Sequence, residues 1–225
     1  MACCSGCVGY AAAERQFGAA VAQRDLDRYR RKGPDASSRL LLDGVKSVAH
    51  PSDSLLDVGA GVGVLSFELL AQGLARATLV DASPAYLSAA RTEAERRGAN
   101  SLVQCVTGDV VHLVGTVDRA DVVVMHRVIC CYPDWRALLG RATQLSGRVL
   151  AVTYPRELWY VRGLMALENL RRRVFGNAFR TFVHSAAAME TVIASAAFER
   201  VSRRRTPVWC VDVYARRDVA SERAT

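Results

Sequence analysis

The sequence of 225 residues has no long hydrophobic run. A helix that crosses a membrane needs about 20 consecutive apolar residues. The run of β-branched residues in Asp121–Met125 is short and charge-flanked, which predicts a buried strand instead. The N-terminus also lacks a basic segment followed by an apolar one, the pattern of a secretory signal. These absences predict a cytoplasmic protein.

Lysine is scarce, and almost all of the basic residues are arginines. The formal net charge is +8, and arginines cluster in Arg28–Lys32, Arg171–Arg173 and Arg203–Arg205. Such clusters indicate either a solvated surface or an anionic partner: a nucleic acid, a membrane surface or an acidic small molecule. No aromatic residues are interleaved with them and no nucleic-acid motif accompanies them, so a solvated surface is favoured and nucleic acid is not expected as a partner.

A second Cys-x-x-Cys motif, at Cys130-Cys131, is missing as well. The chain has seven cysteines, an odd number, at Cys3, Cys4, Cys7, Cys105, Cys130, Cys131 and Cys210. Without an export signal, free thiols are expected rather than disulfides. Structural zinc takes four ligands from two paired clusters. The cysteines near the N-terminus could complete such a set of ligands only with Cys130 and Cys131. We therefore expect no metal site.

Hydrophobic patterning is regular from residue 54 onwards and alternates between strands and helices. Predicted strands are Ser54–Val58, Thr78–Val80, Leu102–Val106, Asp121–Met125 and Arg148–Thr153, with two closing strands at Glu199–Arg205 and Val208–Ala215. Predicted helices are Ala13–Arg31, Ser37–Ala49, Val62–Gln72, Pro84–Arg97, Asp134–Gln144, Glu157–Val174 and Ala186–Ala196. This order predicts an α/β fold with a parallel sheet, helices on both faces and an antiparallel closing pair.

The elements divide the chain into five parts. Residues 1–49 form an N-terminal helical segment that covers the active site, and residues 50–153 form the ligand-binding α/β core. Residues 154–196 are a helical cap in the substrate region, residues 197–215 close the sheet, and residues 216–225 are expected to be a disordered tail.

The loop after the first strand reads Gly59-Ala60-Gly61-Val62-Gly63. Glycine lets the backbone turn sharply and come close to a ligand, and the following helix N-terminus favours a carboxylate or a phosphate. The dinucleotide fingerprint would need its third glycine at Val64. Asp57 also stands two residues before the first glycine, where a carboxylate disfavours a pyrophosphate and suits a ligand that carries an ammonium and a sulfonium.

Two more acidic residues follow the next two strands. Asp81 ends the second strand, about 20 residues past the glycines, where an acid can accept from ribose hydroxyls. Asp109 follows the third strand and could accept from an adenine amino group. Ligands of open α/β sheets bind beyond the carboxyl ends of the strands, so the acids extend one site along that edge.

The segments Leu55–Gly63, Val80-Asp81 and Gly108-Asp109 together resemble the class I S-adenosylmethionine-dependent methyltransferases. The resemblance implies a seven-stranded, Rossmann-like sheet with a reversed final hairpin, and S-adenosyl-L-methionine as the cofactor, with S-adenosyl-L-homocysteine as its product. It implies that the three segments hold the methionine part, the ribose and the adenine respectively. The expected cofactor site is Asp57, Gly59, Ala60, Gly61, Gly63, Asp81, Ala82, Asp109, Val110 and His126.

The segment from Met125 to Asp134 follows the fourth strand and is expected beside the transferable methyl. It resembles the magnesium-protoporphyrin O-methyltransferase branch, which has Ile-His-Tyr-Pro where this chain has Ile129–Pro133. Here a cysteine stands in place of the family histidine, with one residue inserted. The segment Phe179–His184 is similar to the region that caps the substrate in that branch.

His126 is the predicted general base, because histidine titrates near neutral pH and this one ends a strand in the cleft. A structural histidine bonded to backbone is the alternative. Tyr29, on the helix expected to fold over the cleft, is the second catalytic candidate, with simple packing as its alternative. The predicted substrate-binding residues are Tyr29, Cys131, Tyr132 and His184.

The favoured function is methylation of an oxygen, nitrogen or sulfur atom in a small metabolite, which is acidic in one interpretation. The enzyme is expected to belong to secondary metabolism and to be a monomer or a homodimer. Two other functions are open. The basic surface suits an RNA methyltransferase, and the fold also suits a non-catalytic protein or cyclase-like assistant that holds S-adenosylmethionine or S-adenosylhomocysteine.

Overall fold

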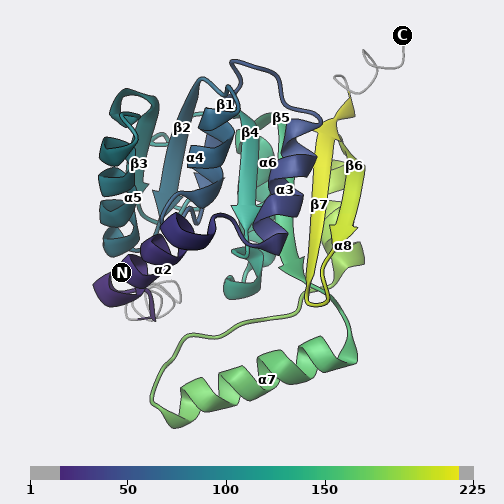
Figure 1. Cartoon of the computed structure of the whole chain (residues 1–225). Helices are drawn as coiled ribbons and strands as arrows, with labels where there is room; N and C mark the ends of the chain where they lie inside the picture. Colours follow the sequence, from purple (N-terminus) through teal and green to yellow (C-terminus); the bar gives the residue numbers. More distant parts are fainter. Residues whose placement is uncertain (1–15, 218–225) are drawn as a thin grey trace.

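The computed structural model describes residues 16–217, and these fold around a central sheet (Figure 1). The sheet has seven strands in the order β3-β2-β1-β4-β5-β7-β6. Five are mutually parallel: β1 (Ser54–Val58), β2 (Arg76–Asp81), β3 (Val103–Thr107), β4 (Ala120–His126) and β5 (Ser146–Pro155). Strand β7 (Trp209–Arg216) is antiparallel to both β5 and β6 (Phe198–Arg205). The predicted fold class, with its reversed final hairpin, is confirmed.

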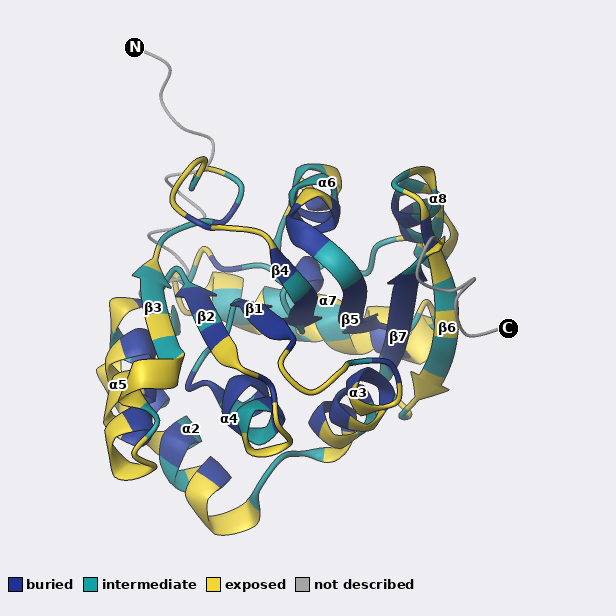
Figure 2. Cartoon of the chain, turned by 90° about the horizontal axis from the view of Figure 1, so that it is seen from above, coloured by how far each residue is buried: buried dark blue, intermediate teal, exposed yellow. Residues whose placement is uncertain are grey.

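Helices cover both faces of the sheet (Figure 2). One face carries α3 (Ala36–Lys46), α4 (Val64–Ala71) and α5 (Pro84–Arg96), with α2 (Ala19–Lys32) packed outside α5. The other carries α6 (Trp135–Leu145) and α8 (Ala186–Ser195). Helix α7 (Trp159–Val174) covers neither face and lies beyond the carboxyl ends of the parallel strands (Figure 1). Short 3-10 helices η1 (Asn100–Leu102) and η2 (Ile129–Cys131) precede β3 and follow β4.

Burial explains why the central strands lack a two-residue alternation. Every residue of β1 is buried, and Val122 to Met125 of β4 are fully enclosed. Strands covered by helices on both sides need apolar side chains at consecutive positions. The run of β-branched residues is therefore an internal strand, as the sequence predicts.

The ends of the elements differ from the sequence predictions by a few residues. Helix α4 begins at Val64 and not at Val62, because Gly63 adopts a left-handed conformation at its N-cap. Strand β2 begins at Arg76 and not at Thr78, because Arg76 and Ala77 pair with β1. The three cysteines near the N-terminus, residues 13–15 of the first predicted helix, and residues 218–225 of the predicted tail lie outside the described range.

Within residues 16–217, no helix combines the length and the apolarity needed to cross a bilayer.

A buried carboxylate ties helix α2 to helix α5. Glu93 has no exposed surface and accepts bonds from Arg30 Nε at 2.9 Å and Arg97 Nε at 2.7 Å. Arg96 bonds both carboxylate oxygens. The bonds from Arg96 first, and then those from Arg97 and Arg30, lower the pKa of Glu93 to about 2 although burial opposes ionisation. The N-terminal helix is therefore held in place by charge as well as by packing.

We expect Glu93→Gln to destabilise the fold near pH 7 by about 2 kcal/mol, because hydrogen bonds to a charged group are lost. Ionised Glu93 contributes its full stability above its unfolded pKa of 4.5 and loses it as the pH falls towards about 2. The difference between wild type and variant should therefore shrink through this window. Urea unfolding at pH 7, 5 and 3 measures it, and a difference that stays constant with pH would contradict the assignment.

Candidate active site

The glycine loop forms a sequence of left-handed turns at the end of β1. The φ angles are +67° at Gly59, +57° at Gly61 and +82° at Gly63, values that side-chain-bearing residues rarely adopt. The loop is anchored to the neighbouring strand, because Gly59 N and Ala60 N donate to the carbonyl oxygen of Val80 at 2.7 and 3.1 Å. The three glycines thus occupy positions where the backbone itself requires them.

Close packing adds a second requirement at two of these glycines. A Cβ on Gly59 would collide with the side chain of Val128, which follows β4. A Cβ on Gly63 would lie 2.7 Å from Phe67 Cε2 and 3.0 Å from Leu79 Cδ2. At Gly61 the nearest atom is Tyr86 Cδ1 at 3.6 Å, an ordinary contact. The loop after β4 therefore closes directly against the glycine loop.

Asp81 joins the glycine loop to the end of β2. Its Oδ2 accepts from Gly61 N at 2.8 Å, and its Oδ1 accepts from Ser83 N at 2.8 Å. Burial raises the pKa of Asp81, while these two amide bonds oppose the shift. Each carboxylate oxygen keeps a second acceptor direction, which a pair of ligand hydroxyls could use. Ala82 lies between Asp81 and Ser83 at the same turn.

Asp57 faces inward, and only 1% of its surface is exposed. Its Oδ2 accepts from Ser66 Oγ of α4 at 2.8 Å. Burial, with a smaller contribution from the charge of Asp81, raises the pKa of Asp57 to about 7. The sequence predicts that this acid faces a ligand ammonium, and this stays a prediction. In the structure Asp57 pairs with Ser66, which also fixes α4 against the loop.

Asp109 holds the segment after β4 against the segment after β3. Its Oδ2 accepts from Tyr132 Oη at 2.7 Å and contacts His112 Nδ1 at 3.1 Å, while its Oδ1 accepts from Val111 N at 3.0 Å. The predicted acceptor for an adenine amino group is therefore already bonded to three partners. Val110 beside it is buried in the core that α6 covers.

His126 ends β4 in a polar cluster built with the start of α3. Its Nε2 lies 2.9 Å from Ser37 Oγ and 3.5 Å from Ser38 Oγ. Arg127 donates to Ser37 Oγ at 2.7 Å and forms an ion pair with Asp35 Oδ2 at 2.8 Å. The Arg127 guanidinium lies 4.8 Å from the centre of the Trp209 ring.

Charge and burial fix the protonation states in this polar cluster. Burial first, and then the positive charge of Arg127, lower the pKa of His126 to about 4, so that the imidazole is neutral at pH 7. Burial opposes ionisation of Asp35, but the Ser38 amide and the Arg127 charge hold its pKa at about 2. If Ser37 donates its proton to Asp35, at 3.0 Å, then His126 must carry its proton on Nε2. Its Nδ1 is then an acceptor.

Tyr29 lies on the buried side of α2, and the hydrogen bonds of its hydroxyl go to residues other than His126. Only 5% of it is exposed, and it packs with Val62, Phe67 and Tyr86. Its hydroxyl donates to Glu68 Oε1 at 2.5 Å and accepts from Arg97. These contacts agree with the packing alternative for Tyr29, and its catalytic role stays a prediction.

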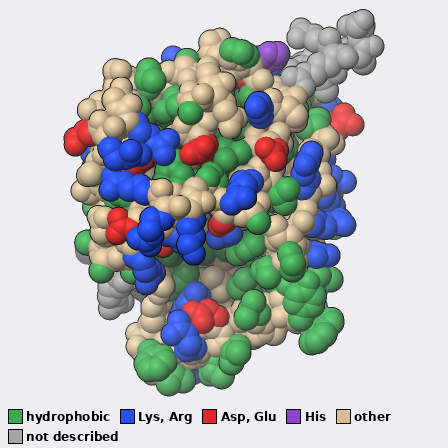
Figure 3. Space-filling model, in the orientation of Figure 1, with side chains coloured by type: hydrophobic (Ala, Val, Ile, Leu, Met, Phe, Trp, Pro, Cys, Tyr) green, Lys and Arg blue, Asp and Glu red, His purple; other side chains and the backbone are tan. Residues whose placement is uncertain are grey.

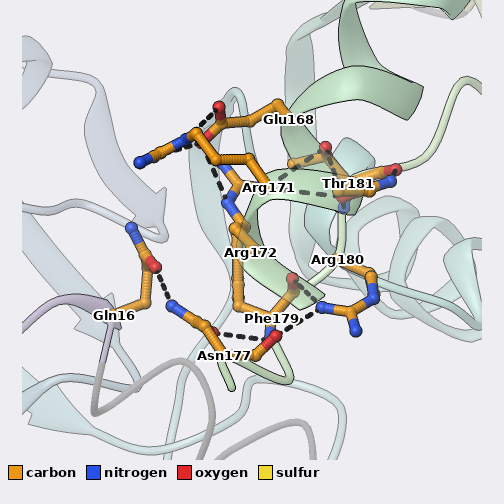
Figure 4. A network of polar contacts seen from close by, with 9 residues as sticks. Gln16, Glu168, Arg171, Arg172, Asn177, Phe179, Arg180 and Thr181 are labelled. Atoms are coloured by element: carbon orange, nitrogen blue, oxygen red, sulfur yellow. Dashed lines mark hydrogen bonds and ion pairs between the residues drawn. The ribbon is translucent and has the colours of Figure 1, made fainter. Parts of the chain in front are cut away.

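Two segments far apart in sequence meet beyond the carboxyl ends of the strands. Asn177 Nδ2 bonds Gln16 Oε1 at 2.5 Å, and the Phe179 ring lies edge-on to Phe17 at 5.2 Å (Figure 4). The chain after α7 then returns to η2, where Phe182 N donates to Cys130 O at 2.7 Å. These contacts place the N-terminal segment and the cap side by side over the sheet edge.

Cys131 and His184 lie where this returning chain meets η2. His184 Nε2 contacts Ile129 O at 3.1 Å, and its ring stacks on Phe182. Cys131 Sγ lies 3.6 Å from Cys130 Sγ and bonds Arg127 O. Hydrogen bonding by Cys130, with burial, raises the pKa of Cys131, so the thiol is protonated at neutral pH.

The sequence analysis missed Asp35, Ser37 and Arg127, which surround His126. Ser37 and His126 stand 89 positions apart, and no local pattern links them. Asp35 carries one readable signal, since it caps α3 by accepting from Ser38 N at 3.0 Å. That signal predicts the start of a helix but not the histidine it faces.

The fold and the glycine loop agree with the comparison to known families. Residues 55–146 match the family model described as a methyltransferase domain. This match supports the resemblance to the class I S-adenosylmethionine-dependent methyltransferases that the sequence motifs indicate, and residues 55–146 are similar to a methyltransferase domain.

The curated relatives match less than half of the chain. They are named ribosomal protein L11 methyltransferase, and those from Pelotomaculum thermopropionicum and Staphylococcus carnosus are 35% and 27% identical over 92 residues. The matched region is 41% of this chain and 29% of each relative's length.

Solved structures share the fold over a longer range. A magnesium protoporphyrin IX methyltransferase from Synechocystis with bound S-adenosylhomocysteine has a TM-score of 0.70 and 18% identity, over 92% of this chain and 99% of that one. An O-methyltransferase family protein from Burkholderia thailandensis has a TM-score of 0.68 and 17% identity, over 87% of this chain and 59% of that one.

The residues present suit S-adenosylmethionine, which is the cofactor of this domain class. The glycine loop leaves its backbone uncovered by side chains at Gly61, and Asp81 has acceptor capacity at the end of β2. Together these offer a close-approach surface and a hydroxyl acceptor. Among residues 16–217, no group of three or more His, Cys, Asp or Glu residues is arranged to hold a metal ion.

Alanine at two of the glycines should separate backbone strain from steric exclusion. Each substitution places a non-glycine residue at positive φ, at a cost of about 1–2 kcal/mol. Gly63→Ala also forces its Cβ against Phe67 and Leu79, which should add about 1–3 kcal/mol, whereas Gly61→Ala should not. Urea denaturation measures both, and equal stability losses in the two variants would contradict this packing.

Proposed function

We propose that the chain transfers a methyl group from S-adenosylmethionine to an oxygen, nitrogen or sulfur atom of a small molecule. The contact between the N-terminal segment and the cap carries this proposal. The two meet through Gln16, Phe17, Asn177 and Phe179, beyond the carboxyl ends of the strands. A site beside two segments of this chain that contact each other suits a metabolite better than a polymer. The likeness to a metabolite methyltransferase over 92% of the chain supports the same choice.

The cofactor supplies an electrophilic methyl on its sulfonium, and the protein contributes alignment, which is worth about 7–11 kcal/mol in the best cases. We propose that the Gly59–Gly63 backbone receives the methionine part and that Asp81 with Ala82 receives the ribose. Asp109 and Val110 are proposed for the adenine. Asp109 can take this role only if one carboxylate oxygen accepts a hydrogen bond from the ligand while Asp109 keeps its bond to Tyr132.

His126 is proposed as the general base for a hydroxyl acceptor. It is neutral at pH 7, so it can accept a proton, and Ser37 fixes its ring through Nε2. Asp35 and Arg127 orient Ser37 in turn. In this arrangement Nδ1 takes the acceptor's proton while the acceptor attacks the methyl carbon. Tyr132, Cys131 and His184 are proposed to line the acceptor side, with the rings of Tyr132 and His184 giving it apolar walls.

A protein acceptor is the second candidate, since the curated relatives are named for a ribosomal protein. Their match spans only 29% of each relative's length, so the acceptor for which those proteins are named is a proposal for this chain. RNA methylation and a non-catalytic cofactor-binding role also stay open. Steep weakening of binding by salt would be the mark of RNA. The proposal includes three further expectations from the sequence. They are the division of the chain into core, cap and closing strands, a cytoplasmic localisation, and a role in secondary metabolism.

Asp81→Asn should weaken S-adenosylhomocysteine binding at least tenfold, because an amide Nδ2 placed towards Gly61 N or Ser83 N brings donor against donor. Asp121→Asn is the matched control, since Asp121 bonds Ser54 at the opposite end of the sheet. Isothermal titration calorimetry measures both. Equal affinities for the wild type and Asp81→Asn would exclude Asp81 from the cofactor site, and no heat with the wild type would refute the function itself.

The pH profile of methyl transfer should identify the base. With His126 as base, the rate should fall with acidity below the pKa of His126, about 4 in the free protein. Arg127 lowers this pKa, so Arg127→Gln should move the acid limb to higher pH. His126→Gln should remove the limb and at least 99% of the rate. Screening candidate acceptors with labelled methyl groups gives the assay, and an unchanged rate in His126→Gln would refute the base.

A further inference from the structure

Helix α7 projects from the body of the protein as an arm beyond the strand ends (Figure 1). Of its 16 residues, only Val161 is buried. One side of the helix packs on the chain that returns from it, because Asn169 bonds both N and O of Thr181 and Arg172 lies over the Phe179 ring at 5.1 Å. This side fixes the helix to its own return loop and leaves the other side uncovered.

The uncovered side is apolar. Large hydrophobic side chains are exposed there by 85% at Trp159, 65% at Leu167, 57% at Leu170, 72% at Val174 and 76% at Phe175. At about 100° per residue, these side chains fall within roughly half of the helix circumference, and Val161 lies outside this span. Figure 3 shows hydrophobic side chains gathered over this arm. We call these five residues the apolar face.

Arginines surround the apolar face. Residues 156–176 hold five arginines and only two glutamates. Glu168 is shared by Arg171 at 2.8 Å and Arg172 at 3.3 Å, and Glu157 contacts Arg162. Within the described range, no carboxylate forms an ion pair with Arg173. The helix therefore combines a Trp/Leu/Phe face with a net positive flank, which is the pattern of helices that lie in a membrane interface.

We propose that α7 docks on an anionic lipid surface, with the apolar face in the headgroup boundary and the arginines on the lipid phosphates. Charge favours this occupant over a second copy of the chain, because two such faces would bring their arginines together. Length also disfavours a small ligand, since 16 helical residues extend about 24 Å. Docking in this way turns the carboxyl ends of the strands, and the proposed acceptor site, towards the membrane.

The test is co-sedimentation of the full chain with vesicles of phosphatidylcholine alone or with 30% phosphatidylglycerol added. We expect binding to the anionic vesicles, weakened by salt. Leu167→Asp with Leu170→Asp should lower this binding about tenfold or more. Arg171→Gln with Arg173→Gln should lower it by roughly thirtyfold, at about 1 kcal/mol for each arginine at the surface. Val114→Asp is the matched control, since Val114 is 75% exposed outside the apolar face.

Each result decides the proposal. Loss of vesicle binding in the two leucine substitutions with retention in Val114→Asp supports it. No binding to anionic vesicles, or equal binding by all variants, overturns it. Light scattering provides the second measurement: a wild-type dimer that Leu167→Asp with Leu170→Asp converts to monomers would assign the face to a second copy instead. Calorimetry with S-adenosylhomocysteine on the same variants shows that the fold is intact, and it is independent of the vesicle result.

Discussion

The backbone turn between β1 and α4 sets the geometry on which the rest of the site depends. Three glycines at positive φ bring the chain back against β2, where Val80 accepts two loop amides and the Asp81 carboxylate accepts a third. The turn has room for only glycine at Gly59, because Val128 of the neighbouring crossover packs on it. One constraint thus joins the ends of β1, β2 and β4.

A second layer of polar contacts builds on that edge. His126 ends β4, one strand from the glycine loop, and the start of α3 supplies Ser37 and Asp35 to hold its ring. The Arg127 charge contributes to the low pKa of His126, after burial, and to the low pKa of Asp35, after the hydrogen bond from the Ser38 amide. The same arginine therefore favours both a neutral imidazole and an ionised carboxylate, a pairing suited to a base with a fixed tautomer.

The cap contrasts with this edge in how it is held. The core of the sheet is closed by apolar contacts on both faces, but α7 is fixed by Val161, by polar bonds from Asn169 and by the Arg172 guanidinium over the Phe179 ring. On the rest of residues 16–217, the exposed large hydrophobic residues are Leu102, Val114 and Val201, which come from separate segments. Because so little of α7 is covered, the helix suits contact with a partner outside the chain. Its arginines indicate that this partner is anionic.

Local rules were sufficient for the elements, the sheet class and the glycine loop, because periodicity, turn glycines and strand-end acids act over a few residues. Val64 in place of a third glycine, with Asp57 before the loop, separated the methyltransferase class from dinucleotide binding. Only the tertiary structure decided which side chains meet. Asp57 turned inward to Ser66, Tyr29 packed away from the cleft, and Ser37 reached His126 across 89 positions. The physical reason is that burial and pairing depend on how the helices pack on the sheet, which no short segment encodes.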